Sequence, residues 1–340
     1  MSAALKSISN LAVTDRCNGR CNICNIWKTK QKREPSLDEI ENFFTYNKGF
    51  LREVSFIQIT GGEPFLRDDL PEIVAIIQKT LPKCMIWIPT NGLQPEKTAE
   101  SVSRMLSQTE NPLLGVTVSI DGDEEFHDRQ RGITGSYRKS IKTVDILNKV
   151  GSKFPSLKRS VGFTLTEGNI SHVLSVQDLA YKYGADFSIR PLNVSEHYYH
   201  NFGMLRKVKI KKVQLTIKKV AARIKQRKGI QSIPTLAYLH GMIDFLEGRR
   251  SLLCSAASES VFIDSIGDVY PCLIMNEKLG NVYDQSMKTI MGSIEAEEAR
   301  RKIRNLNCPN CWLECEVFRD IKNEKTRLLK AWAWALNLSS

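Results

Sequence analysis

The chain has 340 residues, of which 42% are hydrophobic and 25% charged, a globular composition with room for one large domain and a smaller one. No apolar run approaches the roughly 18 to 20 residues of a membrane-spanning helix, and residues 1–13 lack the features of a secretory signal, so we expect a cytoplasmic protein without a transmembrane segment. The net charge of +12 predicts an anionic partner, such as a phosphorylated metabolite, a nucleic acid or a membrane surface.

Residues 7 to about 195 alternate short apolar runs with segments of helical periodicity, which is typical of repeated βα units around a parallel sheet. Six strands are predicted, at 9–14, 53–60, 85–89, 114–120, 158–165 and 185–191. The helices predicted between them are 36–46, 69–81, 99–107, 136–150 and 173–183. This order favours an α/β fold, a partial (β/α)6 barrel of the TIM type.

Three cysteines directly follow the first predicted strand. Cys17, Cys21 and Cys24 form a C-x3-C-x2-C run, and an aromatic residue, Trp27, comes after it. Three thiolates from one short loop can bind three irons of a 4Fe-4S cubane and leave the fourth iron open to a substrate or cofactor. A structural zinc site is the alternative, but such a site usually takes four protein ligands and the loop offers only three.

This loop resembles that of the radical S-adenosylmethionine (SAM) superfamily, and a second motif adds to the resemblance. Residues 59–66 read Ile-Thr-Gly-Gly-Glu-Pro-Phe-Leu at the end of the second predicted strand. In the superfamily a Gly-Gly-Glu-Pro segment binds the SAM amino group, and Gly61, Gly62, Glu63 and Pro64 match it residue for residue. Glycine lets backbone approach a ligand, and a carboxylate accepts hydrogen bonds from an ammonium group.

The ends of the later strands carry weaker parts of this resemblance, because ligands of such barrels bind at the carboxyl ends of strands. The resemblance implies that Ser119 and Asp121 face the SAM ribose and that Arg190 meets the SAM carboxylate or adenine edge. Arg131 is expected to contact the substrate or to have a structural role. The expected cofactor-binding residues are Gly61, Gly62, Glu63, Pro64, Asn91, Ser119, Asp121, Thr164 and Arg190.

Residues 206–228 contain eleven Lys or Arg and no acid, nearly the net charge of the whole chain. We therefore predict a core at 1–205 and a basic helical connector at 206–250. The connector suits an amphipathic helix packed on the barrel, or attraction of an anionic substrate or lipid headgroup. Trp and Leu beside Lys at 328–336 suit either an interface or core packing, so peripheral membrane contact stays open. Nucleic acid is disfavoured, because no stacking platform accompanies the charge.

A small domain is predicted at 251–325 and a C-terminal helix at 326–340. The small domain contains five more cysteines: Cys254, Cys272, Cys308, Cys311 and Cys315. With a hairpin predicted at 261–270, this arrangement resembles the small α+β Twitch and SPASM domains that bind auxiliary 4Fe-4S clusters. The cysteines are too few for two fully ligated cubanes, so one auxiliary cluster is expected. Zinc is the alternative, because C-x2-C pairs also bind zinc.

Five thiols for four irons leave one in excess, and the sequence does not say whether Cys311 or Cys315 is the spare. A spare thiol beside a substrate radical can donate a hydrogen atom, as radical epimerases require; the alternative is a redundant buried cysteine. Cys84, inside a short apolar run, is expected to be a small buried hydrophobe.

The combined features predict a radical SAM enzyme of oxidoreductase or maturase type. Reduced by a donor such as a flavodoxin or ferredoxin, it would cleave SAM to a 5'-deoxyadenosyl radical and abstract a substrate hydrogen. With the auxiliary cluster it would oxidise, or form a bond in, a small anionic metabolite, lipid or peptide. The alternatives are a radical epimerase that uses the spare cysteine, and a non-catalytic iron-sulfur or zinc-binding scaffold. No catalytic side chain is assigned, because the first hydrogen abstraction needs no general base.

Overall fold

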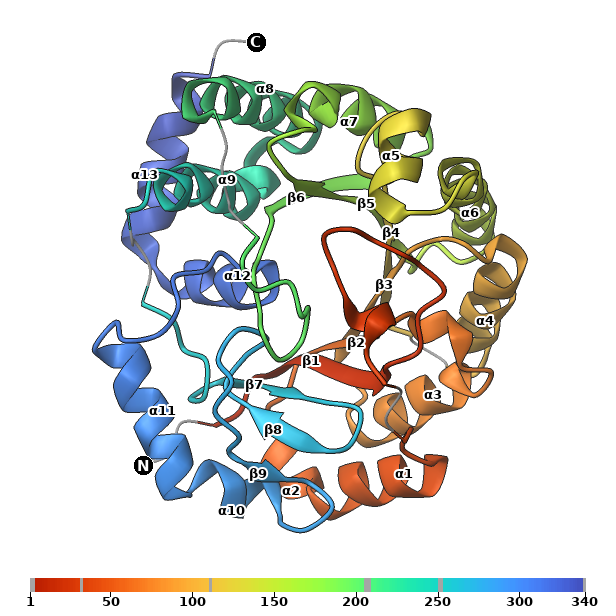
Figure 1. Cartoon of the computed structure of the whole chain (residues 1–340), viewed down its shortest axis with the longest axis vertical. Helices are drawn as coiled ribbons and strands as arrows, with labels where there is room; N and C mark the ends of the chain where they lie inside the picture. Colours follow the sequence, from red (N-terminus) through yellow and green to blue (C-terminus); the bar gives the residue numbers. More distant parts are fainter. Residues whose placement is uncertain (1–3, 31–32, 110–111, 205–208, 250–252, 339–340) are drawn as a thin grey trace.

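The computed structural model describes residues 4–30, 33–109, 112–204, 209–249 and 253–338, and these residues form a nine-stranded sheet surrounded by helices (Figure 1). Its first six strands are parallel, and each pairs with the next along the chain, in the order β6-β5-β4-β3-β2-β1. They are β1 (Ser7–Thr14), β2 (Phe56–Gly61), β3 (Met85–Thr90), β4 (Leu114–Ser119), β5 (Lys158–Leu165) and β6 (Asp186–Pro191). Because β6 does not pair with β1, the strands form an open arc, which confirms the predicted partial barrel.

Residues of the arc strands alternate between an apolar outer face and a more polar inner face. On the outer face, side chains such as Ile57, Ile86 and Val116 are fully buried in the core. The inner residues of β2 to β6 line the lumen and include Gln58, Trp87, Thr117, Ser160 and Ser188. The hydrophobic core is built from the outer face of the strands. The inner face is therefore free to carry polar side chains that can contact a ligand in the lumen.

The helices between the strands are α1 (Leu37–Tyr46), α2 (Lys48–Leu51), α3 (Leu70–Thr80), α4 (Pro95–Ser107), α5 (Glu124–Arg131), α6 (Ser136–Lys153) and α7 (Val173–Lys182), with 3-10 turns η1 (Ile26–Lys28), η2 (Pro64–Leu66) and η3 (Ile170–His172). Five of these helices lie close to the predicted ranges, whereas the short helices α2 and α5 were not predicted. Local sequence sets where the helices begin. The Ser36 hydroxyl accepts a hydrogen bond from the Glu39 amide, and the Glu39 carboxylate accepts one from the Ser36 amide, a capping box that begins α1.

The predicted hairpin at 261–270 forms, and it joins the main sheet. Strand β7 (Ser260–Ile263) pairs in parallel with β1, and β8 (Asp268–Tyr270) pairs antiparallel with β7, followed by β9 (Gly280–Asn281). The turn depends on Gly267 at φ +86°, a conformation that favours glycine. The proposed auxiliary region and the proposed core therefore share one continuous sheet.

Further helices cover the side of the arc that the sheet leaves open (Figure 1). They are α8 (Ile210–Lys228), α9 (Ile233–Leu246), α12 (Glu314–Asn323) and α13 (Lys325–Leu336), with the turn η4 (Gly229–Ser232) and the separate helices α10 (Met287–Met291) and α11 (Ile294–Arg304). Helix α9 packs against α8, α12 and α13, and α12 reaches β1. Helix α8 buries Val213, Ile217 and Ile224, so residues 210–228 of the basic segment form an amphipathic helix, while residues 206–208 lie outside the described residues. Within the described residues, no helix combines the length and hydropathy that crossing a bilayer requires.

Candidate active site and auxiliary metal centre

A cavity of about 210 Å³ lies at the carboxyl ends of the arc strands. Its lining includes the cysteine loop after β1 and seven of the nine residues that the sequence predicts for the cofactor. These lining residues are Cys17, Cys21, Cys24, Gly61, Gly62, Glu63, Asn91, Ser119, Thr164 and Arg190. The other two, Pro64 and Asp121, are absent from the lining. The fold thus gathers at one place residues that are far apart in the sequence.

The cysteine loop fits a cluster that takes three thiolates. Gly19 lies between two of the thiols, since a Cβ on it would be 3.5 Å from the Sγ atoms of both Cys17 and Cys21. Burial raises the pKa of Cys17 and of Cys24 to about 12, and the Glu63 carboxylate adds to the effect at Cys17. Buried thiolates of this kind are stable only beside positive charge, which the irons of a 4Fe-4S cluster would supply.

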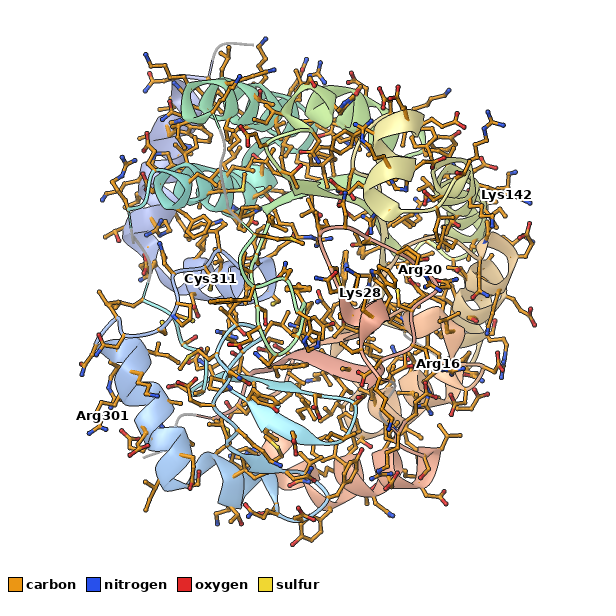
Figure 2. The ribbon with its side chains drawn as sticks, viewed as in Figure 1. Arg16, Arg20, Lys28, Lys142, Arg301 and Cys311 are labelled. Atoms are coloured by element: carbon orange, nitrogen blue, oxygen red, sulfur yellow. The ribbon has the colours of Figure 1, made fainter. Side chains whose placement is uncertain are left out.

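Trp27 braces this loop. Its indole Nε1 donates to the carbonyl oxygen of Cys21 at 3.2 Å. The guanidinium carbon of Arg20 and the Lys28 ammonium each lie 5.1 Å from the ring centroid, and Figure 2 shows both side chains at the loop. Cations stacked on an indole gain modest electrostatic energy, so the aromatic residue after the third cysteine helps to fix the loop.

The two glycines of the Gly-Gly-Glu-Pro segment are required by the backbone that leads into the cysteine loop. A Cβ on Gly61 would be 2.0 Å from the Thr14 carbonyl oxygen, and one on Gly62 would be 2.1 Å from that of Arg16. The amides of Gly62 and Glu63 donate to these same two oxygens, at 2.8 and 2.7 Å. The two glycines thus let the end of β2 contact the segment that leads into the cysteine loop, and their expected approach to a ligand stays a prediction.

The Glu63 carboxylate joins the ends of β2 and β3 at the cavity wall. It accepts hydrogen bonds from the Thr90 hydroxyl at 2.8 Å and from the Asn91 amide at 2.7 Å. Burial raises the pKa of Glu63 to about 7, although these hydrogen bonds favour the charged form. Because each carboxylate oxygen has two lone pairs, the group can also accept a hydrogen bond from an ammonium in the cavity.

Asp121 is fully buried and holds neighbouring segments together. Its carboxylate forms an ion pair with Arg131 and accepts a hydrogen bond from the Thr164 amide at 2.9 Å. Burial acts to raise the pKa of Asp121, but Arg131 and His127 hold it below the ordinary value. Arg131 Nη1 also lies 3.8 Å from Cys21 Sγ. Asp121 thereby links the end of β4 to the cysteine loop through Arg131, and its expected position facing the SAM ribose stays a prediction.

Tyr198 and Tyr199, after β6, also line the cavity and were not predicted. The Tyr198 hydroxyl donates to the Gly61 carbonyl oxygen at 3.0 Å and lies 3.0 Å from the Thr60 hydroxyl, and the Tyr199 carbonyl oxygen accepts from the Asn25 amide at 2.8 Å. The segment after β6 therefore supports both the glycine motif and the cysteine loop. In the sequence, the only sign that this segment reaches the cavity is the pair of adjacent tyrosines after the last predicted strand of the barrel.

A second cavity of about 480 Å³ occupies the lumen of the arc. The residues shared by the two cavities are Gln58, Pro89, Arg190, Glu314 and Cys315. Arg190 Nη1 donates to a Glu314 carboxylate oxygen at 3.1 Å, so an ion pair lies at this junction. The Tyr238 hydroxyl of the lumen is buried and has no hydrogen-bond partner within the described residues. A buried polar group without a partner marks a place where a ligand can form a hydrogen bond.

Four of the five C-terminal cysteines line one separate pocket: Cys254, Cys272, Cys308 and Cys311. Figure 2 shows Cys311 beside α12. Across the described part of the chain, no three His, Cys, Asp or Glu side chains converge as they would around a single metal ion. Four thiols that line one pocket match the four cysteine ligands of a 4Fe-4S cluster.

Cys315 lies apart from this group of four. It is in the first turn of α12 and lines both the strand-end cavity and the lumen. Its Sγ accepts a hydrogen bond from Asn10 Nδ2 at 3.4 Å, and burial raises the pKa of the thiol. Of the two cysteines that the sequence left undecided, Cys311 is therefore grouped with the auxiliary thiols, and Cys315 faces the candidate active site.

Three curated relatives match much of the chain. The antilisterial bacteriocin subtilosin biosynthesis protein AlbA of Bacillus subtilis is 26% identical, over 83% of this chain and 58% of its own length. The AdoMet-dependent heme synthase of Methanosarcina barkeri is 23% identical, over 86% and 83%. The mycofactocin maturase MftC of Mycobacterium tuberculosis is 27% identical, over 76% and 62%. The chain thus spans less than two thirds of AlbA and MftC.

Solved structures share the fold. Streptococcus suis SuiB bound to S-adenosylmethionine has a TM-score of 0.67 at 15% identity, covering 96% of this chain and 76% of SuiB. The anSMEcpe protein with bound AdoMet and Cp18Cys peptide has a TM-score of 0.63 at 18% identity, covering 98% and 100%.

Family models match both halves of the described site. Residues 11–175 match the model of the radical SAM superfamily, and residues 254–316 match that of SPASM, an iron-sulfur cluster-binding domain. The first range contains the cysteine loop and the Gly-Gly-Glu-Pro segment, and the second contains the four grouped thiols. The chain therefore belongs to the radical SAM superfamily and carries a C-terminal SPASM domain, an architecture that implies a 4Fe-4S cluster, SAM and additional iron-sulfur binding.

Proposed function

We propose that this chain is a radical SAM oxidoreductase or maturase that removes a hydrogen atom from a substrate at the junction of the two cavities. Cys254, Cys272, Cys308 and Cys311 would hold one auxiliary 4Fe-4S cluster, which would supply an acceptor for the electron of the substrate radical. When bound, the first cluster and SAM supply the 5'-deoxyadenosyl radical that takes the hydrogen. The net result is oxidation of the substrate, or formation of a bond within it.

The observation that carries this proposal is the short segment that joins the auxiliary pocket to the active-site cavity. Cys311 lines the auxiliary pocket, while Glu314 and Cys315 line the active-site cavity. Only Trp312 and Leu313, just before α12, separate Cys311 from Glu314 along the chain. An electron leaving a substrate at the junction would have a short path to the auxiliary pocket, and this closeness supports the electron-acceptor role.

In this proposal each group of residues has a defined task. Cys17, Cys21 and Cys24 hold the first cluster. The Gly61–Glu63 backbone and carboxylate receive the SAM amino group, Ser119 and Thr164 face the ribose, and Arg190 meets the carboxylate or adenine edge. Asp121 acts through Arg131 as a positioning residue for the cysteine loop.

The lumen is the proposed substrate site. Its free Tyr238 hydroxyl and the Arg190–Glu314 pair offer a donor, a cation and a carboxylate to a polar substrate. Among anionic metabolites, lipids and peptides, a peptide gains support from relatives named for bacteriocin and mycofactocin maturation, and from a structurally similar SuiB that was solved with the precursor peptide SuiA. A flavodoxin or ferredoxin is the proposed source of the electron.

The test is anaerobic reconstitution followed by dithionite and SAM, with iron, sulfide and 5'-deoxyadenosine measured. We expect about eight irons per chain, which corresponds to two cubanes, and SAM cleavage by the wild-type protein. Cys24→Ala should lose about half the iron and all cleavage. Cys311→Ala should lose iron but keep cleavage. About four irons in the wild-type protein would remove the auxiliary cluster, and no cleavage would leave a non-catalytic scaffold.

Epimerisation is the second candidate, and the position of Cys315 favours it. A substrate radical could take the hydrogen atom of the Cys315 S–H group, leaving a thiyl radical. One electron from a reduced auxiliary cluster, replenished by the external donor, and one proton from solvent would restore the thiol. The product would then gain deuterium from D2O, and Cys315→Ser would lose this label while retaining both clusters and SAM cleavage. An unlabelled product would leave the oxidative proposal.

A further inference from the structure

A groove on the outer surface, separate from both cavities, lies between α8, η4 and α13. Its volume is about 800 Å³. Figure 1 shows α8 and α13 beside each other in the same part of the molecule, and the Lys225 ammonium donates to the Ala335 carbonyl oxygen at 2.7 Å. Leu236 and Ala335, both buried, belong to its lining. We call this feature the α8–α13 groove.

The α8–α13 groove has an exposed apolar rim. The exposed fractions are 79% for Ile230, 61% for Leu336, 57% for Leu215 and 50% for Trp332, and all four residues line the groove. Trp332 and Leu336 are four residues apart in α13 and so share one helix face. Large apolar side chains that are exposed together, around a concave surface, mark an interaction site.

The charged residues that line the groove are all basic. Helix α8 contains eight Lys or Arg and no acid, and the groove lining contains Lys218, Lys219, Arg223 and Lys225 but no Asp or Glu. Arg223 pairs with Asp178 at 2.8 Å. Lys218 and Lys219, in contrast, have no ion-pair partner among the residues that the structure describes. An occupant of this groove would therefore bring carboxylates to the α8 side.

We propose that the α8–α13 groove docks an acidic amphipathic helix of a partner polypeptide. A helix with apolar residues on one face and glutamates on the other matches both the apolar lining and the basic rim, in the manner of helix-in-groove recognition. A flat bilayer could contact Ile230 and Leu336 but could not fill a concavity whose lining reaches the buried Leu236. This proposal goes beyond the proposed function and does not rest on it.

The test measures fluorescence anisotropy with the full chain. The probe is a labelled synthetic helix with leucines at helical spacing on one face and glutamates on the other, and its scrambled sequence is the control. We expect saturable binding of the helix, weaker at high salt, and none of the scrambled peptide. Trp332→Ala should weaken binding about tenfold, and so should Lys218→Glu with Lys219→Glu. Arg301→Glu, which reverses an exposed charge on the distant α11 (Figure 2), should leave binding unchanged.

Several results would overturn the proposal. One is the absence of saturable binding, and another is binding that neither groove variant weakens. Retention of the chain on anionic phosphatidylglycerol vesicles with no peptide binding would assign the surface to membranes. A concentration-dependent dimer that Trp332→Ala dissociates would assign it to a second copy of the chain. Because SAM cleavage is not needed for any of these measurements, failure here is distinct from failure of the proposed reaction.

Discussion

Replacing Gly62 by alanine should separate the glycine motif from the cysteine loop without changing any thiol. The added Cβ would be 2.1 Å from the Arg16 carbonyl oxygen and 2.8 Å from that of Asp15, and both are backbone atoms. Ordinary contact begins at 3.4 Å, so β2 and the loop must separate by about 1.3 Å, the difference between 3.4 and 2.1 Å. The hydrogen bonds from Gly62 and Glu63 to Thr14 and Arg16 would then break, at about 1 kcal/mol each.

We expect the rate of 5'-deoxyadenosine formation to fall about 100-fold, because a displacement of about 1 Å can have an effect of that size on a positioned reaction. The assay uses reconstituted protein with dithionite and SAM. Gly49→Ala is the matched control, since a Cβ at Gly49 meets nothing within 4 Å. A Gly62→Ala protein that keeps its iron and cleaves SAM within about threefold of the wild-type rate would refute this account of the motif.

Three further predictions follow from buried groups. Cys315→Ala should keep the full iron content of the wild-type chain, whereas Cys311→Ala should lose up to about four irons, one cubane; equal losses would contradict the grouping of the thiols. Arg131→Gln leaves a buried carboxylate without its partner and should lower the free energy of unfolding by about 3 to 5 kcal/mol in urea, while Arg129→Gln, at an exposed pair, should change it by less than about 1 kcal/mol. Burial lowers the pKa of His127 from 6.5 to about 4, so the unfolded state binds the proton more tightly. The free energy of unfolding of the iron-free chain should therefore fall as pH is lowered through this window, by up to about 3 kcal/mol, and His127→Asn should remove that part of the slope.

The sequence predicted the arc well because each strand carries a local signal. The predicted 158–165 strand agrees with β5 at both ends, and the other five differ by only a few residues. The polar residues at strand ends were also informative, since parallel strands bring their carboxyl ends to one rim. Local periodicity and topology together were therefore enough to locate the cavity.

Contacts between segments that are distant in the chain could not be predicted from the sequence. Cys311 and Cys315 are four residues apart, and only the direction in which α12 enters the lumen decides which of them faces the substrate. The ion pair between Asp121 and Arg131 was likewise not predicted, because Arg131 comes from α5 and meets Asp121 only in the folded chain. Spacing identifies the residue types of a site, but packing decides which group each of them meets.

The pairing of β7 with β1 has a consequence for how the chain is made. Strand β1 begins at Ser7, close to the start of the sequence, whereas β7, which pairs with its other edge, begins only at Ser260. During synthesis the strand that leads into the cysteine loop has one open edge until most of the chain has left the ribosome, and open edges invite pairing with other chains. A fragment that stops before β7 should therefore aggregate, and cluster loading during synthesis should await the C-terminal hairpin.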